Sequence, residues 1–313
     1  MLSFLKYIFI ATLRLGTPIA LTSMGGCFSQ RGGINNIGLD AQMTLGALLG
    51  VCGAYWFQNA WLGVLTGMVA GLLMGLIHGF VVNTCGAPMA VSSQAMILFS
   101  QGLTIIVLFA VFGNVGYSDQ VASISSTPAL AGIPLVGDTL SQLSPLVYLG
   151  LLILAALNFL LYKTPFGLQM QACGEHPRAA DTAGIPVTLY RYLGVLTSGA
   201  LGGLGGAMLS IGYMNLFQDG MIAGRGFLAV GAISLGGYTL KGAYMAGLLF
   251  GFFDALQLYV QTTGLPIPSQ FVQMIPYLAS LLVIIFASGR RSSRRGQPPA
   301  ALGQPYSKIS GTR

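Results

Sequence analysis

Runs of apolar residues follow one another along nearly the whole chain, and short polar stretches separate them. Nine runs stand out, at about 5–28, 41–57, 61–82, 91–112, 145–162, 193–214, 222–240, 242–262 and 270–288. A helix of about 20 apolar residues is long enough to cross a bilayer, whereas the strands of a membrane barrel alternate over about ten residues. Because the runs are continuous, they predict an all-α, polytopic transmembrane helix bundle with about 9–10 membrane segments.

The second run is short and follows a stretch rich in glycine and asparagine, which contains Gly32, Gly33, Asn35, Asn36 and Gly38. Irregular backbone at membrane depth is tolerated only where protein or a water-filled cavity surrounds it. We therefore expect one broken or re-entrant segment at this point of the chain.

Composition supports a lipid environment. Of the 313 residues, 54% are hydrophobic and only 7% are charged, whereas soluble domains carry about 25% charged residues. The net charge of +7 does not indicate nucleic acid as a partner, because the basic residues lie beside apolar runs. We interpret the first run as an uncleaved membrane span.

Lysine and arginine predict the orientation. The loop at about 163–192 carries Lys163, Arg178 and Arg191, and the tail at 289–313 is basic, with Arg290, Arg291, Arg294, Arg295, Lys308 and Arg313. Both are expected on the cytoplasmic side, and four predicted spans separate them, an even number. Nine full spans would then place the N-terminus outside, although Lys6 and Arg14 argue against that side.

The same pattern divides the chain into a transmembrane domain at 1–288 and a tail at 289–313. The tail is polar, basic and rich in proline, glycine and serine, so we expect it to be flexible. The stretch between 113 and 145 has no lysine or arginine and is expected outside.

Glycine recurs every fourth residue in the third run, at Gly67, Gly71, Gly75 and Gly79. Such a stripe lies on one helix face and lets two helix backbones approach closely. We interpret it as a helix-packing surface.

A few polar residues lie within or beside the apolar runs, where they are costly and often functional. The candidates for a path taken by a polar solute are Asn35, Asn36, Asp40, Gln42, Asp254 and Gln257. Asp40 has a second interpretation as the cap of the helix that follows it, and Asp254 as part of an interhelical hydrogen-bond network. Arg225 is expected to pair with Asp219 or to extend towards the interface.

No arrangement of residues indicates an enzyme or a metal site. The four cysteines, Cys27, Cys52, Cys85 and Cys173, have no metal-binding spacing, and the two histidines are far apart. No Ser/His/Asp set or pair of acidic residues is present in the sequence, so we expect no catalytic residues, no metal and no cofactor bound by this chain.

The loop between the fifth and sixth runs contains the sequence Ala172 to Pro186, which predicts a short capped helix. Pro177 suits the first helical turn, Glu175 lies near the positive end of the helix dipole, and Gly184 suits the position just past the last turn. A helix too polar to enter lipid presents a surface for a soluble partner.

This loop resembles the coupling loop of ABC importer permeases, in the superfamily that carries branched-chain amino acids, ribose and nucleosides. The resemblance rests on Gly174, Glu175, Pro177, Ala179, Ala180, Gly184 and Ile185. The segments 36–43 and 224–229 resemble two further motifs of the superfamily, and 299–306 is similar to the nucleoside-type members. Asp40 and Ala41 stand where the superfamily usually has Glu and Gly.

The resemblance implies the membrane-spanning permease subunit of a bacterial ABC importer for a nucleoside or simple sugar, located in the cytoplasmic membrane. It also implies that the loop helix docks on a separate ATPase subunit, which uses the ATP, and that a second permease subunit and a solute-binding lipoprotein complete the system. The chain has no Walker A motif, since none of its lysines follows a glycine. The alternative is a self-sufficient secondary transporter of a small polar solute.

Overall fold

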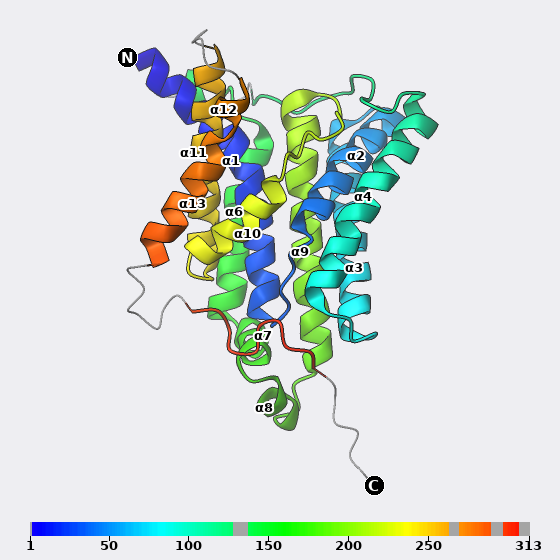
Figure 1. Ribbon diagram of the computed structural model, residues 1–313, viewed down its shortest axis with the longest axis vertical. Coiled ribbons are helices and arrows are strands. Elements are labelled where there is room, and N and C mark those ends of the chain that lie inside the picture. Colours follow the sequence, from blue (N-terminus) through cyan, green and yellow to red (C-terminus); the bar gives the residue numbers. More distant parts are fainter. Residues whose placement is uncertain (1, 128–136, 263–268, 289–296, 307–313) are drawn as a thin grey trace.

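A computed structural model describes residues 2–127, 137–262, 269–288 and 297–306 (Figure 1). Within these ranges the chain is helical and contains no β-strand. The predicted all-α bundle is therefore confirmed. The helices are α1 (Leu2–Arg31), α2 (Leu39–Phe57), α3 (Ala60–Asn83), α4 (Met89–Phe112), α5 (Gly137–Leu140), α6 (Pro145–Lys163), α7 (Pro165–Glu175), α8 (Pro177–Thr182), α9 (Val187–Leu209), which a π-turn (Ser210–Met214) continues, α10 (Arg225–Leu235), α11 (Leu240–Thr262), α12 (Ser269–Gln273) and α13 (Ile275–Ser288).

Six of the described helices are long and apolar enough to cross a membrane: α1, α3, α4, α6, α9 with its π-turn, and α11. The predicted span at 222–240 is wrong as a full helical crossing. Its helix, α10, has only 11 residues and is therefore about 16 Å long, roughly half of the hydrocarbon core. The chain before it is irregular because Gly220 and Gly224 adopt positive φ angles.

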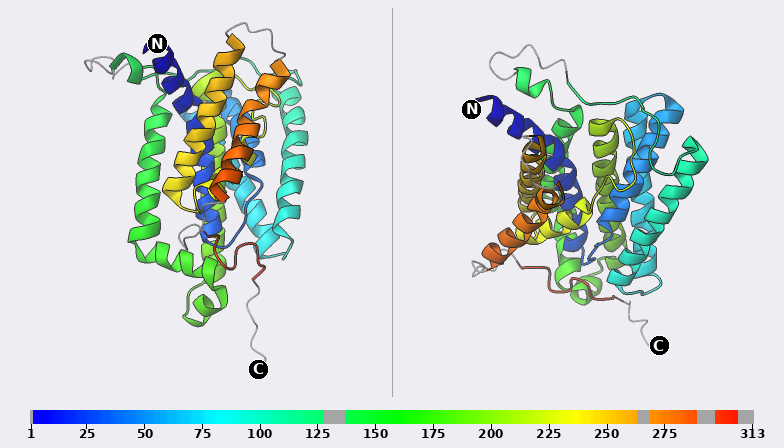
Figure 2. Two further views of the ribbon diagram at one scale, coloured as in Figure 1. Left: turned by 60° about the vertical axis from the view of Figure 1, so that its left-hand side comes forward. Right: turned by 45° about the horizontal axis from the view of Figure 1, so that its top comes forward.

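The centre of the bundle is α9. Its apolar window is 83% buried inside the protein, against 22–44% for the other candidate spans. It packs against α1, α2 and α3, while α4 and α6 stand at the edges of the bundle (Figures 1 and 2). Most side chains of α9 therefore meet protein rather than lipid.

Glycine brings the backbones of α3 and α9 into contact. A side chain at Gly71 would collide with the backbone of Gly199 and Gly203, and one at Gly203 would collide with the Gly67 carbonyl. Gly75 meets the Val195 carbonyl in the same way, whereas Gly79 lies against the ring of Tyr192. The predicted stripe thus faces α9, and α9 contributes Gly199 and Gly203 to the same contact.

Two irregular segments enter the bundle from opposite ends (Figure 1). Residues 32–38 return from the end of α1 into the interior, where α2 begins, and residues 215–224 come from the other end to α10. The expected broken element therefore exists, but α2 itself is one unbroken helix of 19 residues that starts inside the protein. A second, unexpected irregular segment precedes α10.

The two ends of the bundle are formed by different parts of the chain. Helices α7 and α8 and the tail lie at one end, which we call the α8 end, and the N-terminus lies at the other (Figure 1). This arrangement fits an odd number of crossings. Arg14, near the N-terminus, donates a hydrogen bond to the carbonyl of Gln142 at that opposite end. The bases Lys163, Arg178 and Arg191 all belong to the α8 end.

Part of the tail has a defined path. Residues 297–306 cross the α8 end and hydrogen-bond to it (Figure 2), whereas the flexibility of the tail stays a prediction. The arginines at 290, 291, 294 and 295, with Lys308 and Arg313, lie outside the described residues.

The contact between α3 and α9 leads to a prediction for Gly71→Ala. The added methyl group would meet backbone atoms, which have little freedom to move, so the free energy of unfolding should fall by about 1–3 kcal/mol. Thermal unfolding in detergent measures this loss. Gly102→Ala is the matched control, because Gly102 on α4 has open space around it. Equal stabilities for the two variants would contradict the packing described here.

Candidate functional site

The predicted site residues fall into two places. The polar residues of the predicted solute path lie mainly around the N-termini of α2 and α10, inside the bundle. The residues of the predicted coupling helix lie on α7 and α8, at one end of the bundle. The irregular segment 32–38 connects the two places, because it begins beside α7 and leads to α2.

The N-termini of α2 and α10 meet inside the protein. Asp40, in the first turn of α2, accepts a hydrogen bond through its Oδ1 from the backbone N–H of Gly226, at 3.0 Å. A side chain at Gly226 would collide with the backbone of Asp40. Asp40 makes no capping bond within its own helix. The expectation that Asp40 caps its own helix is therefore wrong. Asp40 instead caps the neighbouring helix α10, where a carboxylate is also favoured by the helix dipole.

Arg225 forms an ion pair beside this contact. Its Nε lies 2.8 Å from Oδ2 of Asp254 on α11, and the two side chains are 19% and 5% exposed. Its Nη1 also donates to the carbonyls of Met221 and Ile222. The expected partner Asp219 is exposed, so the prediction that Arg225 pairs with Asp219 is wrong. Asp254 belongs to the interhelical network that was its alternative interpretation.

A second polar cluster lies between the segment 32–38 and α9. The side-chain amide of Asn36 donates to Oε1 of Gln42 at 3.2 Å and to the hydroxyl of Ser198 at 2.9 Å. All three side chains are buried. This cluster thus holds the segment 32–38 against α9, and it leaves the Nε2 donor of Gln42 without a partner among the described protein atoms.

Two of the predicted path residues lie apart from these contacts. Asn35 is half-buried, and its Oδ1 accepts a hydrogen bond from Gln30 at the end of α1. Gln257 is half-buried on α11, one turn beyond Asp254. The structure therefore brings Asp40, Arg225, Gly226 and Asp254 together, which we call the interior junction.

Helix α7 was not predicted from the sequence. It begins at Pro165, after Thr164, whose hydroxyl accepts a hydrogen bond from the Gly167 N–H as an N-cap, and it crosses the α8 end of the bundle (Figure 2). Gly167 and Gly174 allow close approaches, since a side chain at Gly174 would collide with the carbonyl of Arg31. The Pro and Thr that start α7 were the sequence signal for it.

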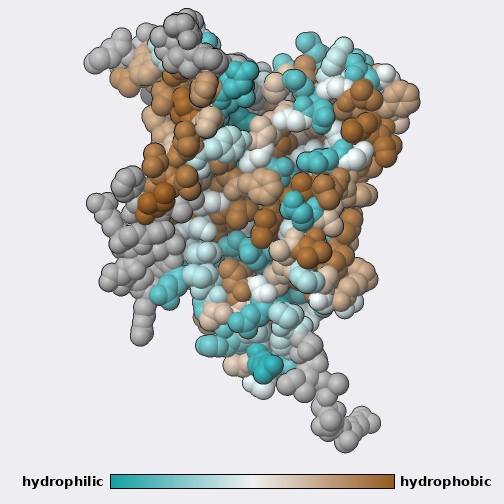
Figure 3. Space-filling model, in the orientation of Figure 1, coloured by the Kyte–Doolittle hydropathy of each residue, from teal (hydrophilic) through white to brown (hydrophobic). Residues whose placement is uncertain are grey.

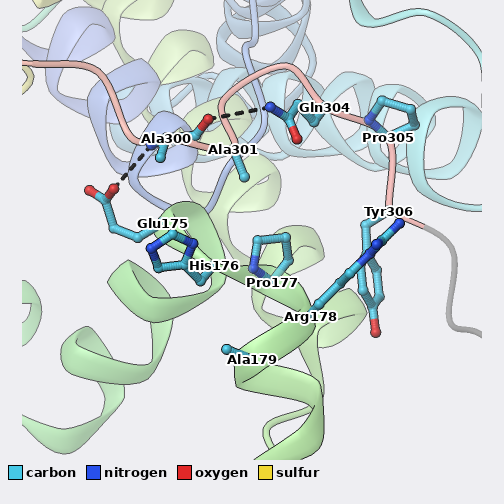
Figure 4. A pocket seen from close by; sticks show the side chains of 10 residues that line it. All are labelled: Glu175, His176, Pro177, Arg178, Ala179, Ala300, Ala301, Gln304, Pro305 and Tyr306. Carbon is cyan, nitrogen blue, oxygen red and sulfur yellow. Dashed lines mark hydrogen bonds between the residues drawn. The ribbon is translucent and has the colours of Figure 1, made fainter.

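Helix α8 is the predicted short helix. Pro177 occupies its first turn, and its end has the hydrogen-bond pattern of a Schellman motif, with Ile185 N–H bonded to Ala180 C=O and Gly184 at a φ of +81°. Glu175 has a different role from the one expected. It ends α7 and does not cap α8, and its Oε2 accepts from the Ala300 N–H at 3.0 Å (Figure 4).

The two alanines of the motif face opposite ways. Ala179 is exposed, together with Arg178 and Thr182, whereas Ala180 is only 4% exposed and belongs to the hydrophobic core. A partner that approaches α8 from outside the bundle therefore meets Ala179. Ala180 instead holds the helix on the protein, as does the half-buried Ile185 behind it.

Arg191, which the sequence marks only as a charge that sets orientation, is among the largest fully buried side chains. Its Nη1 donates to the Gln304 carbonyl at 3.2 Å, and its guanidinium lies 5.6 Å from the ring centre of Tyr306. Burial raises the pKa of the neighbouring Cys173 thiol to about 11, although the charge of Arg191 opposes the rise. Cys173 is therefore neutral at physiological pH.

A family model and three relatives all match this chain to permeases of transport systems. The family model described as the permease component of branched-chain amino acid transport systems matches residues 8–287. A nucleoside ABC transporter permease protein of Lactococcus lactis is 35% identical, over 91% of this chain and 93% of its own length. A guanosine ABC transporter permease protein of Bacillus subtilis is also 35% identical, over 97% of both chains. A putative glucose ABC transporter permease of Haloferax volcanii is 30% identical, over 98% of this chain and 99% of its own.

The ion pair of the interior junction yields a prediction. Asp254→Asn leaves the Arg225 charge without its partner in a largely buried place, and such losses cost on the order of 3–5 kcal/mol of unfolding free energy. The double variant Arg225→Gln/Asp254→Asn should recover part of that loss, because no unpaired charge remains. Thermal unfolding in detergent measures both.

Asp219→Asn is the control for this experiment, because Asp219 is exposed and forms no ion pair with Arg225. Its stability should equal that of the unmodified protein. A greater loss with Asp219→Asn than with Asp254→Asn would contradict the pairing found here.

Proposed function

Because the chain belongs to the family of permease components of branched-chain amino acid transport systems, we propose that it is the membrane subunit of a bacterial ABC importer that moves a nucleoside. The permease role follows from the family. The nucleoside is proposed because two relatives that align along nearly the whole chain are named as nucleoside and guanosine permeases. A simple sugar is the second candidate, because another relative is named as a putative glucose permease.

The ATPase subunit is proposed to dock on α8. The observation that carries this proposal is the exposed face of α8, with Arg178, Ala179 and Thr182 turned away from a buried Ala180. The helix is too short and too polar to cross lipid, and it projects beyond the end of the bundle (Figure 1). ATP is used by that partner, and this chain holds no cofactor in the proposed mechanism.

The α8 end is proposed to face the cytoplasm, where the ATPase subunit would dock. The α8 end carries Lys163, Arg178 and Arg191, so the positive-inside rule places it in the cytoplasm, together with the C-terminal tail. The N-terminus and the loop after α4 then face outside, where the solute-binding lipoprotein would deliver its cargo. The membrane is the cytoplasmic membrane of a bacterium.

The second permease subunit is proposed to cover the face shown in Figure 3. There, hydrophilic and neutral side chains line the notch at the top, hydrophobic ones mix with them lower down the centre, and the right flank and the upper left flank are mostly hydrophobic. The flanks suit lipid, while the notch suits a partner and a polar solute. Whether the partner is a second copy or a related chain does not alter this arrangement.

The interior junction is proposed to respond to the movement of α8. Asp40, Arg225 and Asp254 form the contacts of this junction. Asp40 joins the N-termini of α2 and α10, and the ion pair of Arg225 with Asp254 joins α10 to α11. Closure of the ATPases would shift α8, and the segment 32–38 would carry the shift to α2. The solute would then meet Asn36, Gln42 and the junction in turn as the cavity opens from one side to the other.

Docking on α8 predicts the effect of Ala179→Asp. A carboxylate in the centre of the exposed face should prevent the ATPase from co-purifying with the chain and should abolish uptake, because a buried unpaired charge opposes association. Ala122→Asp is the matched control, since Ala122 is exposed in the loop at the opposite end. It should leave ATPase association unchanged. Retention of both ATPase and uptake by Ala179→Asp would refute the docking surface.

The substrate assignment predicts the outcome of a competition experiment. Proteoliposomes with the assembled transporter and its binding protein should take up labelled guanosine, and unlabelled adenosine or uridine in excess should compete. Glucose and leucine in the same excess should leave uptake unchanged. Saturable glucose uptake that guanosine fails to inhibit would replace the nucleoside by the sugar.

A further inference from the structure

The described part of the tail makes backbone contacts with two separate elements of the α8 end. The N–H of Ala301 donates to the Gly174 carbonyl at 3.0 Å, next to the bond from Ala300 to Glu175. Two residues after Ala301, the N–H of Gly303 donates to the Gly33 carbonyl at 3.2 Å. The tail therefore joins the end of α7 to the first residues of the segment 32–38. We call residues 299–306 the strap.

Side chains fasten the strap as well. Pro299 and Ala301 are buried, whereas Ala300 between them is exposed. Figure 4 shows the strap passing over the end of α7 and the start of α8, with Tyr306 beside α8. Burial raises the pKa of the Tyr306 hydroxyl, and the neighbouring Asp181 carboxylate adds to this rise.

Arg191 anchors the far end of the strap. A buried guanidinium needs acceptors, and within the described chain its hydrogen bond goes to the Gln304 carbonyl, while the Tyr306 ring covers it at a distance typical of cation–π contacts. Arg191 extends from α9, the central helix. The strap is thus tied to α7, to the segment 32–38 and to α9 within eight residues.

A groove of about 640 Å³ runs between the strap and the α7–α8 turn. Its walls are Glu175 to Ala179 on one side and Ala300, Ala301 and Gln304 to Tyr306 on the other (Figure 4). The strap therefore contacts the α7–α8 turn at Glu175, and the groove lies between the strap and the first residues of α8. A movement of α8 across this space reaches the strap directly.

We propose that the strap is a positioning element of the transport cycle, which carries the movement of α8 to the segment 32–38 and so to the interior junction. This rests on the proposed docking of an ATPase on α8. The strap connects the carbonyl of Gly174, which precedes α8, to the carbonyl of Gly33, which precedes Asn36 and α2. The segment 32–38 also meets α7 directly, since Gly32 lies near the Met170 side chain and Gly33 lies near the backbone of Cys173 and Gly174, and the strap adds a backbone hydrogen bond to each of the two elements.

The experiment compares two truncations of the full transporter complex. One removes residues 297–313 and with them the strap. The other removes residues 307–313 and keeps the strap, so that both lack Lys308 and Arg313. Co-purification of the ATPase, ATP hydrolysis in proteoliposomes and solute uptake are measured for each.

Loss of the strap should leave the ATPase bound, because the exposed face of α8 is unchanged, but uptake per ATP hydrolysed should fall by roughly fivefold or more, in line with typical coupling changes between sites. The shorter truncation should match the full chain. An unchanged ratio of uptake to ATP hydrolysis after strap removal would overturn the proposal. Loss of the bound ATPase would also overturn it, because the strap would then belong to the docking surface.

A point variant keeps the proposal testable if the longer truncation does not fold. Tyr306→Ala removes the ring over Arg191 and should lower the coupling ratio, whereas Tyr306→Phe keeps the ring and should restore it. Equal ratios for these two variants would speak against the anchoring role of the ring and therefore against the proposal.

Hydrogen exchange of the isolated chain provides a readout that needs no ATPase. Removal of the strap should speed amide exchange in residues 31–38 and 172–176, and removal of 307–313 should not. Failure of the docking proposal would instead appear as full association of the Ala179→Asp variant, so the two failures are distinguishable. Unchanged exchange in both peptides would show that the strap does not hold them, and would end the proposal.

Discussion

Backbone polar groups that enter a membrane must find partners inside the protein, and this constraint explains the layout of the bundle. Two segments, 32–38 and 215–224, are irregular. The first is buried or half-buried throughout, whereas the second is exposed at 218–220 and buried again at Ile222, before α10. The first is held by Asn36, which bonds to α2 and α9. The second leads to α10, whose Gly226 N–H is bonded by Asp40. The buried parts of both segments therefore have partners on the surrounding helices.

Helix α9 provides that surrounding protein. Its glycines let α2 and α3 approach to backbone contact, and Gly203 meets both Gly46 and Gly67. A larger side chain at these positions would push the helices apart and open the interior to lipid or water. Close packing also preserves the polar cluster of Asn36, Gln42 and Ser198, because Ser198 lies on the same helix as the glycines. The packing surface and the polar interior are thus parts of one arrangement.

The position of the irregular segment 32–38 links the interior to the α8 end. It begins where Gly174 of α7 touches Arg31 and Gly33, and it ends at the first turn of α2. A change imposed on α7 and α8 therefore acts on a segment without helical hydrogen bonds of its own, which can shift more easily than a helix. Such a segment is a reasonable hinge, because loop residues absorb changes of φ and ψ that packed helices resist.

The sequence by itself determined the class of the protein, most of the long helices and the place of the short helix α8. These follow from local properties: apolar length, glycine spacing, and proline and glycine at the ends of α8. The sequence also identified Asp40, Asn36 and Asp254 as costly polar groups, because a charge in an apolar run stands out without any knowledge of its surroundings.

Only the tertiary structure decided which groups these residues meet. Asp40 bonds to α10 and not to its own helix, and Arg225 pairs with Asp254 and not with Asp219, because partners far apart in sequence become neighbours when α2, α10 and α11 pack. Likewise, Ala179 and Ala180 look alike in the sequence, and only the packing of α8 exposes one and buries the other. The path of residues 299–306 depends on carbonyls of α7 and of residue 33, which no local pattern in the tail reveals.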